Sequence, residues 1–171
     1  MSRRVGLRHM QSIGAKKPCP SGEQIVNGGF ETGDFTGWTV TNPVRVLIYS
    51  YSPYEGLYYV HMKHQYGDPD SSISQDLLNL VPKACLTDSS IFNVALLGTY
   101  NECGHFGNQA IIRITYSDDT YTDVNWEAPN SGWNVLDLKG YVEAGKTVKN
   151  IKISFKDDWG YMEVDACSCV P

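Results

Sequence analysis

The sequence lacks the features that mark several large classes of protein. It has no apolar run near the ~20 residues that cross a bilayer, and it has no phosphate-binding loop, dinucleotide fingerprint, G-x-S-x-G elbow or H-E-x-x-H motif. Lys and Arg number 14 against 19 Asp and Glu, whereas nucleic-acid binding needs a basic surplus on one face. We therefore expect no membrane insertion, no nucleic-acid partner and no enzymatic activity.

We also expect no secretory signal in the first residues, because Arg8, His9 and Gln11 interrupt the apolar stretch that a signal peptide needs. Residues 1–20 contain no acidic residue. We predict a basic N-terminal arm over residues 1–22 and one domain over residues 23–171. The arm is either a flexible tail or an anchor that docks on other protein subunits through residues 1–20.

The remainder contains no convincing amphipathic helix and has the pattern of short strands. Ile151, Ile153 and Phe155 alternate with Lys152 and Ser154, which is typical of a strand with one buried face. Strands are predicted over 44–51, 57–63, 71–78, 90–100, 109–117, 120–126, 133–138, 148–156 and 161–167. This number and spacing predicts an all-β fold, an antiparallel β-sandwich with jelly-roll topology.

Four segments resemble carbohydrate-binding modules with a β-jelly-roll fold, which are related to the galactose-binding-like superfamily. NGGFETGDFTGW (27–38) resembles their first strand and following turn, and similar likenesses hold for PYEGLYYV (53–60), SSISQDLLNLVP (71–82) and GYMEVDAC (160–167). The resemblance spans residues 24–169 and implies a sugar-binding domain.

The same resemblance implies a structural calcium ion that ties the first strand to the last. The matching positions are Glu31 and Asp165, with backbone oxygens near Gly29, Glu55 and Gly56. Carboxylate and carbonyl oxygens are the ligands that Ca²⁺ prefers. The alternative is that Glu31 and Asp165 are ordinary surface acids.

Aromatic side chains provide candidate sugar contacts, because flat rings pack against the C–H faces of sugars. Tyr49, Tyr51 and Tyr54 cluster in IYSYSPY, and the i, i+2 spacing of the first two predicts a shared strand face. Trp126, Trp133 and Trp159 lie near expected strand ends or turns. The alternative for each ring is that it fills the core.

Five cysteines leave at least one thiol without a partner inside the chain. Cys167 and Cys169 are expected to face the same side of the last strand, where Cys19 could reach one of them. Other possibilities are a Cys85–Cys103 bond, free thiols, or a zinc site. The zinc site would combine Cys19, His105, Cys167 and Cys169.

Two functions are consistent with these features. The first is a non-catalytic structural or surface-decoration subunit of a homo- or hetero-oligomeric assembly, such as a virion capsid or tail or an extracellular filament, anchored by the basic arm. The alternative is a carbohydrate-binding module, free or part of a secreted glycan-active protein. In both cases the domain would sit on a virion or extracellular surface, where it could meet a surface glycan.

Overall fold

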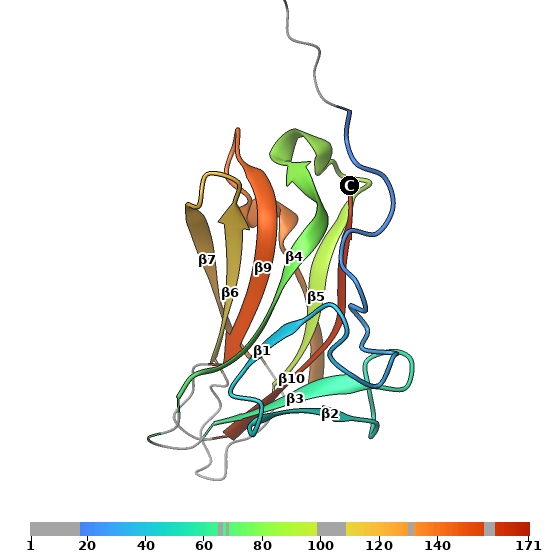
Figure 1. Cartoon of the computed structure of the whole chain (residues 1–171), viewed down its shortest axis with the longest axis vertical. Coiled ribbons are helices and arrows are strands. Elements are labelled where there is room, and N and C mark those ends of the chain that lie inside the picture. The colour runs from blue at the N-terminus through green and yellow to red at the C-terminus, as the bar shows by residue number, and fades with distance from the viewer. Residues whose placement is uncertain (1–17, 65–66, 68, 99–108, 130–131, 156–159) are drawn as a thin grey trace, which may run out of the picture.

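A computed structural model describes residues 18–64, 67, 69–98, 109–129, 132–155 and 160–171 (Figure 1). The basic residues of the proposed arm up to position 17 lie outside the described residues, so the arm stays a prediction. Cys103, His105 and Trp159 lie outside them as well.

Ten strands of the described chain form two antiparallel five-stranded sheets. The first sheet has the order β1 (Thr39–Thr41), β4 (Ser71–Pro82), β9 (Thr147–Phe155), β6 (Gln109–Tyr116) and β7 (Tyr121–Glu127). The second has the order β2 (Val46–Tyr49), β3 (Tyr59–His64), β10 (Gly160–Val170), β5 (Ile91–Gly98) and β8 (Gly132–Asp137). The predicted all-β class, the sandwich and the jelly roll are confirmed.

Nine of these strands coincide with the strands predicted from the sequence; β1 was not predicted. Two 3₁₀ turns, η1 (Lys83–Cys85) and η2 (Lys139–Tyr141), complete the secondary structure of the described part. No helix in these residues is long and apolar enough to cross a membrane.

The core lies between the sheets and follows the predicted alternation. Ile151, Ile153 and Phe155 of β9 are buried, whereas Lys152 and Ser154 between them are partly exposed. Facing them from the second sheet are buried residues of β3, β5 and β10, such as Val60, Leu96 and Val164. An apolar face on each sheet is sufficient to drive the two sheets together.

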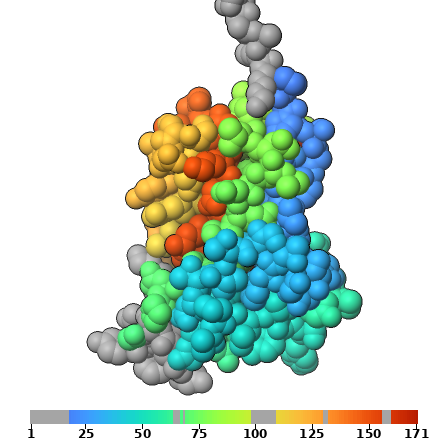
Figure 2. All heavy atoms as spheres, in the orientation of Figure 1, coloured from blue at the N-terminus to red at the C-terminus, as the bar shows by residue number. Residues whose placement is uncertain are grey.

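The first and last described segments lie side by side, as expected from the sequence. Gln24 N–H donates to the Cys169 carbonyl at 2.8 Å, and Cys167 N–H donates to the Gly28 carbonyl at 3.0 Å. The Gln24 carbonyl also accepts from Leu78 of β4 at 2.9 Å, so this segment links β10 of the second sheet to β4 of the first. Figure 2 shows residues before β3 (blue to cyan) as a continuous band beside the green surface of β4.

The predicted first strand within residues 27–38 is wrong. These residues form successive turns, since Asn27, Phe30, Gly33 and Gly37 all have positive φ, which is incompatible with a regular strand. The Asn27 side chain supports the turns by donating to the Asp34 carbonyl at 3.1 Å.

The cysteine pairing inferred from the sequence is also wrong. Cys19 forms a disulfide with Cys85, the last residue of η1. This bond rules out the pairing of Cys19 with the last strand and the pairing of Cys85 with Cys103. Cys167 and Cys169 are free and buried on one side of β10, and burial raises the pKa of both thiols, for Cys169 to about 12. A zinc site that includes Cys19 is therefore excluded.

We expect Gly28→Ala to destabilise the fold, because a Cβ at this position would overlap the Cys167 carbonyl oxygen. The cost should be about 1–3 kcal/mol, as for other overpacked sites, and it is measurable by chemical denaturation. Gly140→Ala is the matched control, since nothing lies within 4 Å of the position that its new methyl group would take. Equal stability of the two variants would contradict the close approach of the first and last segments.

Candidate functional site

Two carboxylates hold the loop of residues 54–58 against the sandwich. Glu31 accepts the Leu57 N–H at 3.0 Å and the Tyr58 N–H at 3.2 Å. Asp165 Oδ2 accepts the Tyr54 N–H at 3.0 Å and the Glu55 N–H at 3.1 Å. We call these two side chains and the four amides the carboxylate clasp. It joins an early turn, the loop after β2 and the last strand.

The local backbone is shaped for this clasp. Gly56 has φ +65°, and a Cβ there would overlap the Glu31 carboxylate. At the other carboxylate, β10 has an irregular register between Asp165 and Ser168, with Ala166 at φ 47°. This bulge lets the Ala166 N–H donate to Asp165 Oδ1 at 2.7 Å.

Asp165 is fully buried, although it is an acid. Burial raises its pKa to about 6 and the nearby Glu55 charge adds to this shift, while the three amide donors oppose it. Within the described part of the chain, no Lys or Arg pairs with Asp165 or Glu31. The clasp therefore concentrates negative charge without a basic side chain to offset it.

The oxygens around Gly29 are compatible with a hard cation in their chemistry. A Cβ atom placed on Gly29 would lie 3.9 Å from Asp165 Oδ1, 4.0 Å from Glu55 Oε1 and 3.7 Å from Glu31 Cγ. However, no group of three His, Cys, Asp or Glu side chains among the described residues forms a metal-binding cluster. Any ion here would also need backbone carbonyl oxygens.

A connected cluster of rings covers the outer face of the second sheet. Tyr54 contacts Trp133 with ring centroids 5.9 Å apart, Trp133 contacts Tyr59 at 6.1 Å, and Tyr59 contacts Tyr49 at 6.2 Å. His61 continues the series, 4.8 Å from both Tyr49 and Tyr161. We call these six rings the aromatic cluster. Tyr49 and Tyr54 are 37% and 44% exposed, so the cluster reaches solvent.

The cluster contains buried polar groups. His61 Nδ1 lies 3.3 Å from Glu163 Oε1, and both side chains are almost fully buried. Burial and the Glu163 carboxylate raise the pKa of Tyr59 to about 12. His61 Nε2 is buried, and among the described residues it has no hydrogen-bond partner. Aromatic faces thus lie directly beside hydrogen-bonding groups.

A hollow of about 270 Å³ adjoins the aromatic cluster on the same face. Its lining residues come from β5, β8, β10 and the clasped loop: Tyr54, Glu55, Ile91, Asn93, Ala95, Val135, Ala166 and Ser168. Tyr54 belongs to both the cluster and the hollow. The loop that the clasp holds therefore forms one wall of the site.

The structure brings only some of the predicted sugar-binding residues together. Tyr49, Tyr54 and Trp133 belong to the aromatic cluster. Tyr51 does not share a strand face with Tyr49, because β2 ends at Tyr49; it is 85% exposed in the following loop. Trp126 lies on the inner side of β7 with its ring in the core, next to a smaller hollow on the other sheet. Trp159 lies outside the described residues.

Sequence reasoning missed Tyr59, His61, Tyr161 and Glu163. The i, i+2 spacing of these residues within β3 and β10 was a usable signal, since side chains two apart share a face. The spacing does not say which face of the sheet is the outer one. That required the sheet order, which places β3 and β10 side by side with His61 opposite Glu163.

Comparison with solved structures places the fold among carbohydrate-binding β-sandwiches. The chain is similar to the family 61 carbohydrate-binding module TmCBM61, solved with β-1,4-galactotriose, with TM-score 0.53 and 17% identity over 85% of this chain and 95% of that one. It is also similar to a family 16 carbohydrate-binding module, with TM-score 0.54 and 14% identity over 86% and 99%. The resemblance to jelly-roll carbohydrate-binding modules is thus confirmed at the level of fold.

A third similar structure is the enzymatically active domain of tailspike protein 4 of bacteriophage CBA120, with TM-score 0.57 and 13% identity. The match covers 84% of this chain and 20% of the tailspike chain. No protein-family model and no curated protein matches the sequence.

We expect Asp165→Ala to destabilise the protein by about 2 kcal/mol or more, since it leaves three amides without their acceptor and each unsatisfied buried donor costs about 1–3 kcal/mol. Chemical denaturation measures this change, and Trp fluorescence reports whether Tyr54 moves away from Trp133. Glu127→Gln, an exposed site on the other sheet, is the control. A free energy of unfolding equal to that of the control would show that the clasp does not hold the loop.

Proposed function

We propose that the protein binds a glycan chain on the outer face of its second sheet. The aromatic cluster carries this proposal, because partly exposed rings lie beside buried carboxylate, imidazole and phenol groups. Rings pack against sugar C–H faces, and polar groups placed among them select hydroxyl positions. The carbohydrate-binding fold supports the same function by analogy only.

The binding face is built for a preformed site. Trp133 Nε1 donates to the Ser52 carbonyl at 3.4 Å, and Tyr54 is held at its amide by Asp165. The rings of the loop and of β8 are therefore ordered before a ligand arrives, which lowers the entropy cost of binding. Binding without chemistry is the role we assign to this face.

A calcium ion at the clasp is part of the proposal. Glu31 and Asp165 would supply carboxylate oxygens, and backbone oxygens near Gly29 and Glu55 would complete the shell. The ion would offset the unpaired charge of the buried Asp165 and strengthen the hold on the loop. Its role would be structural.

The role of a surface-decoration subunit is a second proposal. The similarity in fold to a phage tailspike domain favours it. It depends on residues 1–20, which would anchor the domain to other subunits of a virion or an extracellular structure. A decoration subunit of this kind could still present the glycan-binding face outward, so the two roles are compatible.

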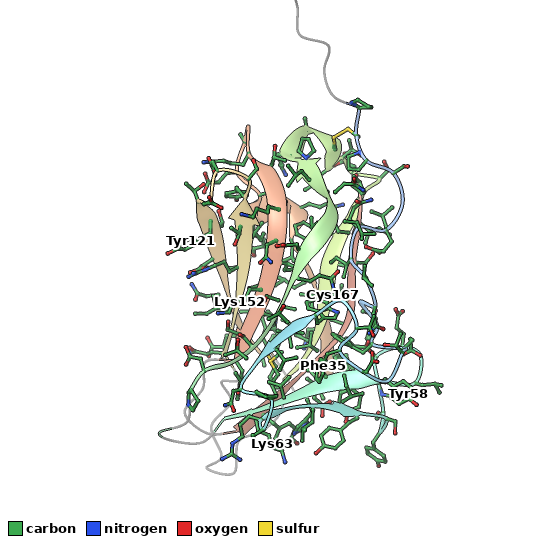
Figure 3. The ribbon with its side chains drawn as sticks, viewed as in Figure 1. Phe35, Tyr58, Lys63, Tyr121, Lys152 and Cys167 are labelled. Carbon is green, nitrogen blue, oxygen red and sulfur yellow. A yellow bond between two sulfur atoms is a disulfide. The ribbon has the colours of Figure 1, made fainter. Side chains whose placement is uncertain are left out.

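Tyr54→Ala and Trp133→Ala should each weaken glycan binding by roughly tenfold, equal to about 1.4 kcal/mol, because each removes a ring that packs against the sugar. A glycan array identifies the ligand and calorimetry measures the affinity. Tyr121→Ala is the control: Tyr121 is half exposed on the other sheet, under the Arg113 guanidinium. Figure 3 labels Tyr121 on the side of the molecule opposite Tyr58 of the clasped loop. Wild-type affinity in both cluster variants would refute the proposed site.

Calcium should stabilise the chelator-treated protein by about 2.7 kcal/mol when its concentration is 100 times Kd, because the ion binds the folded state alone. Thermal denaturation with and without Ca²⁺ measures this shift. Glu31→Gln should abolish it and Glu127→Gln should retain it. A melting temperature that does not respond to Ca²⁺ would mean that the amides alone satisfy the clasp.

A further inference from the structure

The hollow beside Tyr54 is too small to enclose a whole ligand. Its volume of about 270 Å³ lies below the 300–1,000 Å³ or so of pockets that surround a complete small molecule. It adjoins the aromatic cluster, since Tyr54 belongs to both and Val135 lies two residues from Trp133 on the same face of β8. It is suited to one part of a ligand whose remainder lies on the rings.

The walls of the hollow combine apolar and hydrogen-bonding groups in the way a sugar requires. Ile91, Ala95 and Val135 supply an apolar floor, while Asn93 and Ser168 supply neutral donors and acceptors. The floor is hydrogen-bonded sheet: Ala95 pairs with Asp165 on one side and with Val135 on the other, and the β10 bulge between Asp165 and Ser168 lies at its margin. Such a floor is rigid, so the shape of the hollow is fixed by the fold.

The charge around the hollow has one sign. Glu55 lines it, and the buried Asp165 carboxylate lies directly behind the amides of Tyr54 and Glu55. No Lys or Arg is among the described residues that line it. Lys139 follows the end of β8. Its Nζ donates to the Ser90 carbonyl at 2.7 Å and lies 3.7 Å from Asp137 Oδ2. A calcium ion at the clasp would leave the net charge here negative, because the three carboxylates of Glu31, Glu55 and Asp165 carry more charge than one divalent cation.

We propose that this hollow is a subsite for an uncharged sugar residue at one end of a glycan chain that crosses Tyr54, and that Glu55 excludes chains carrying uronate or sulfate there. This inference rests on the proposed glycan binding and names the class of glycan. Like charges separated by a few ångströms repel by about 1 kcal/mol even in water, which corresponds to a factor of about five in affinity.

The experiment uses matched pairs of ligands with the full-length protein. Six-unit β-1,4-linked galactan, glucan and mannan oligosaccharides are each tested as the neutral chain and after oxidation of C6 to a carboxylate. We expect at least one neutral chain to bind and its oxidised form to bind at least fivefold more weakly. In 1 M salt this preference should shrink, since the Debye length falls to about 3 Å.

Glu55→Gln tests the residue itself. The variant keeps the shape of the side chain and the backbone groups of the clasp, and it should reduce the preference for the neutral chain by about fivefold. Glu127→Gln, which makes the same charge change on the other sheet, should leave the preference as in the wild type. Val135→Phe, which fills the hollow from an exposed edge-strand position, should remove the affinity gained with the last sugar units of the chain.

The outcomes separate the two claims. An oxidised chain that binds as tightly as its neutral parent, or an unchanged preference in Glu55→Gln, would overturn the charge filter while leaving glycan binding in place. An unaltered dependence on chain length in Val135→Phe would overturn the subsite. If neither form of any chain binds and the glycan array is also blank, the proposed function fails and this inference fails with it.

Discussion

The carboxylate clasp positions the loop around which the proposed site is arranged. A loop that lies over a sheet has amide groups that no neighbouring strand satisfies, and these amides bond to water or to side chains. Glu31 and Asp165 provide the side-chain acceptors for Tyr54, Glu55, Leu57 and Tyr58. Because one acid precedes the first strand and the other lies in the last, the loop can be held only after the whole chain has folded.

Stability and recognition are consequently coupled at Tyr54. Its amide belongs to the clasp, while its ring belongs to both the aromatic cluster and the hollow. A change in the clasp therefore alters the position of the ring that would meet the ligand. Burying an unpaired carboxylate costs free energy, and a natural fold tolerates such a cost most often at a functional site. The clasp is consistent with that pattern.

The strands were predictable because their signal is local. Alternating burial, as at Ile151, Lys152 and Ile153, follows from the two-residue period of a strand and needs no knowledge of neighbours. The turns of residues 27–38 were mistaken for a strand, because apolar Phe30 and its glycines suit both conformations and only the positive φ of Asn27 and Phe30 separates them. The partner of Cys19 was missed for a similar reason: several cysteines were compatible, and only the folded chain brings Cys85 within reach.

Sequence alone was enough to predict the all-β class and nine of the strands. A likeness to known modules also drew attention to Glu31 and Asp165, which accept hydrogen bonds from amides of the same loop. Which aromatic residues act together became clear only in the folded chain. Folding buried Trp126 in the core, separated Tyr51 from Tyr49, and joined Tyr59, His61 and Trp133 to the cluster. Alternation along a strand sorts side chains into two faces, but the order and packing of the sheets decide which face is covered and which meets solvent.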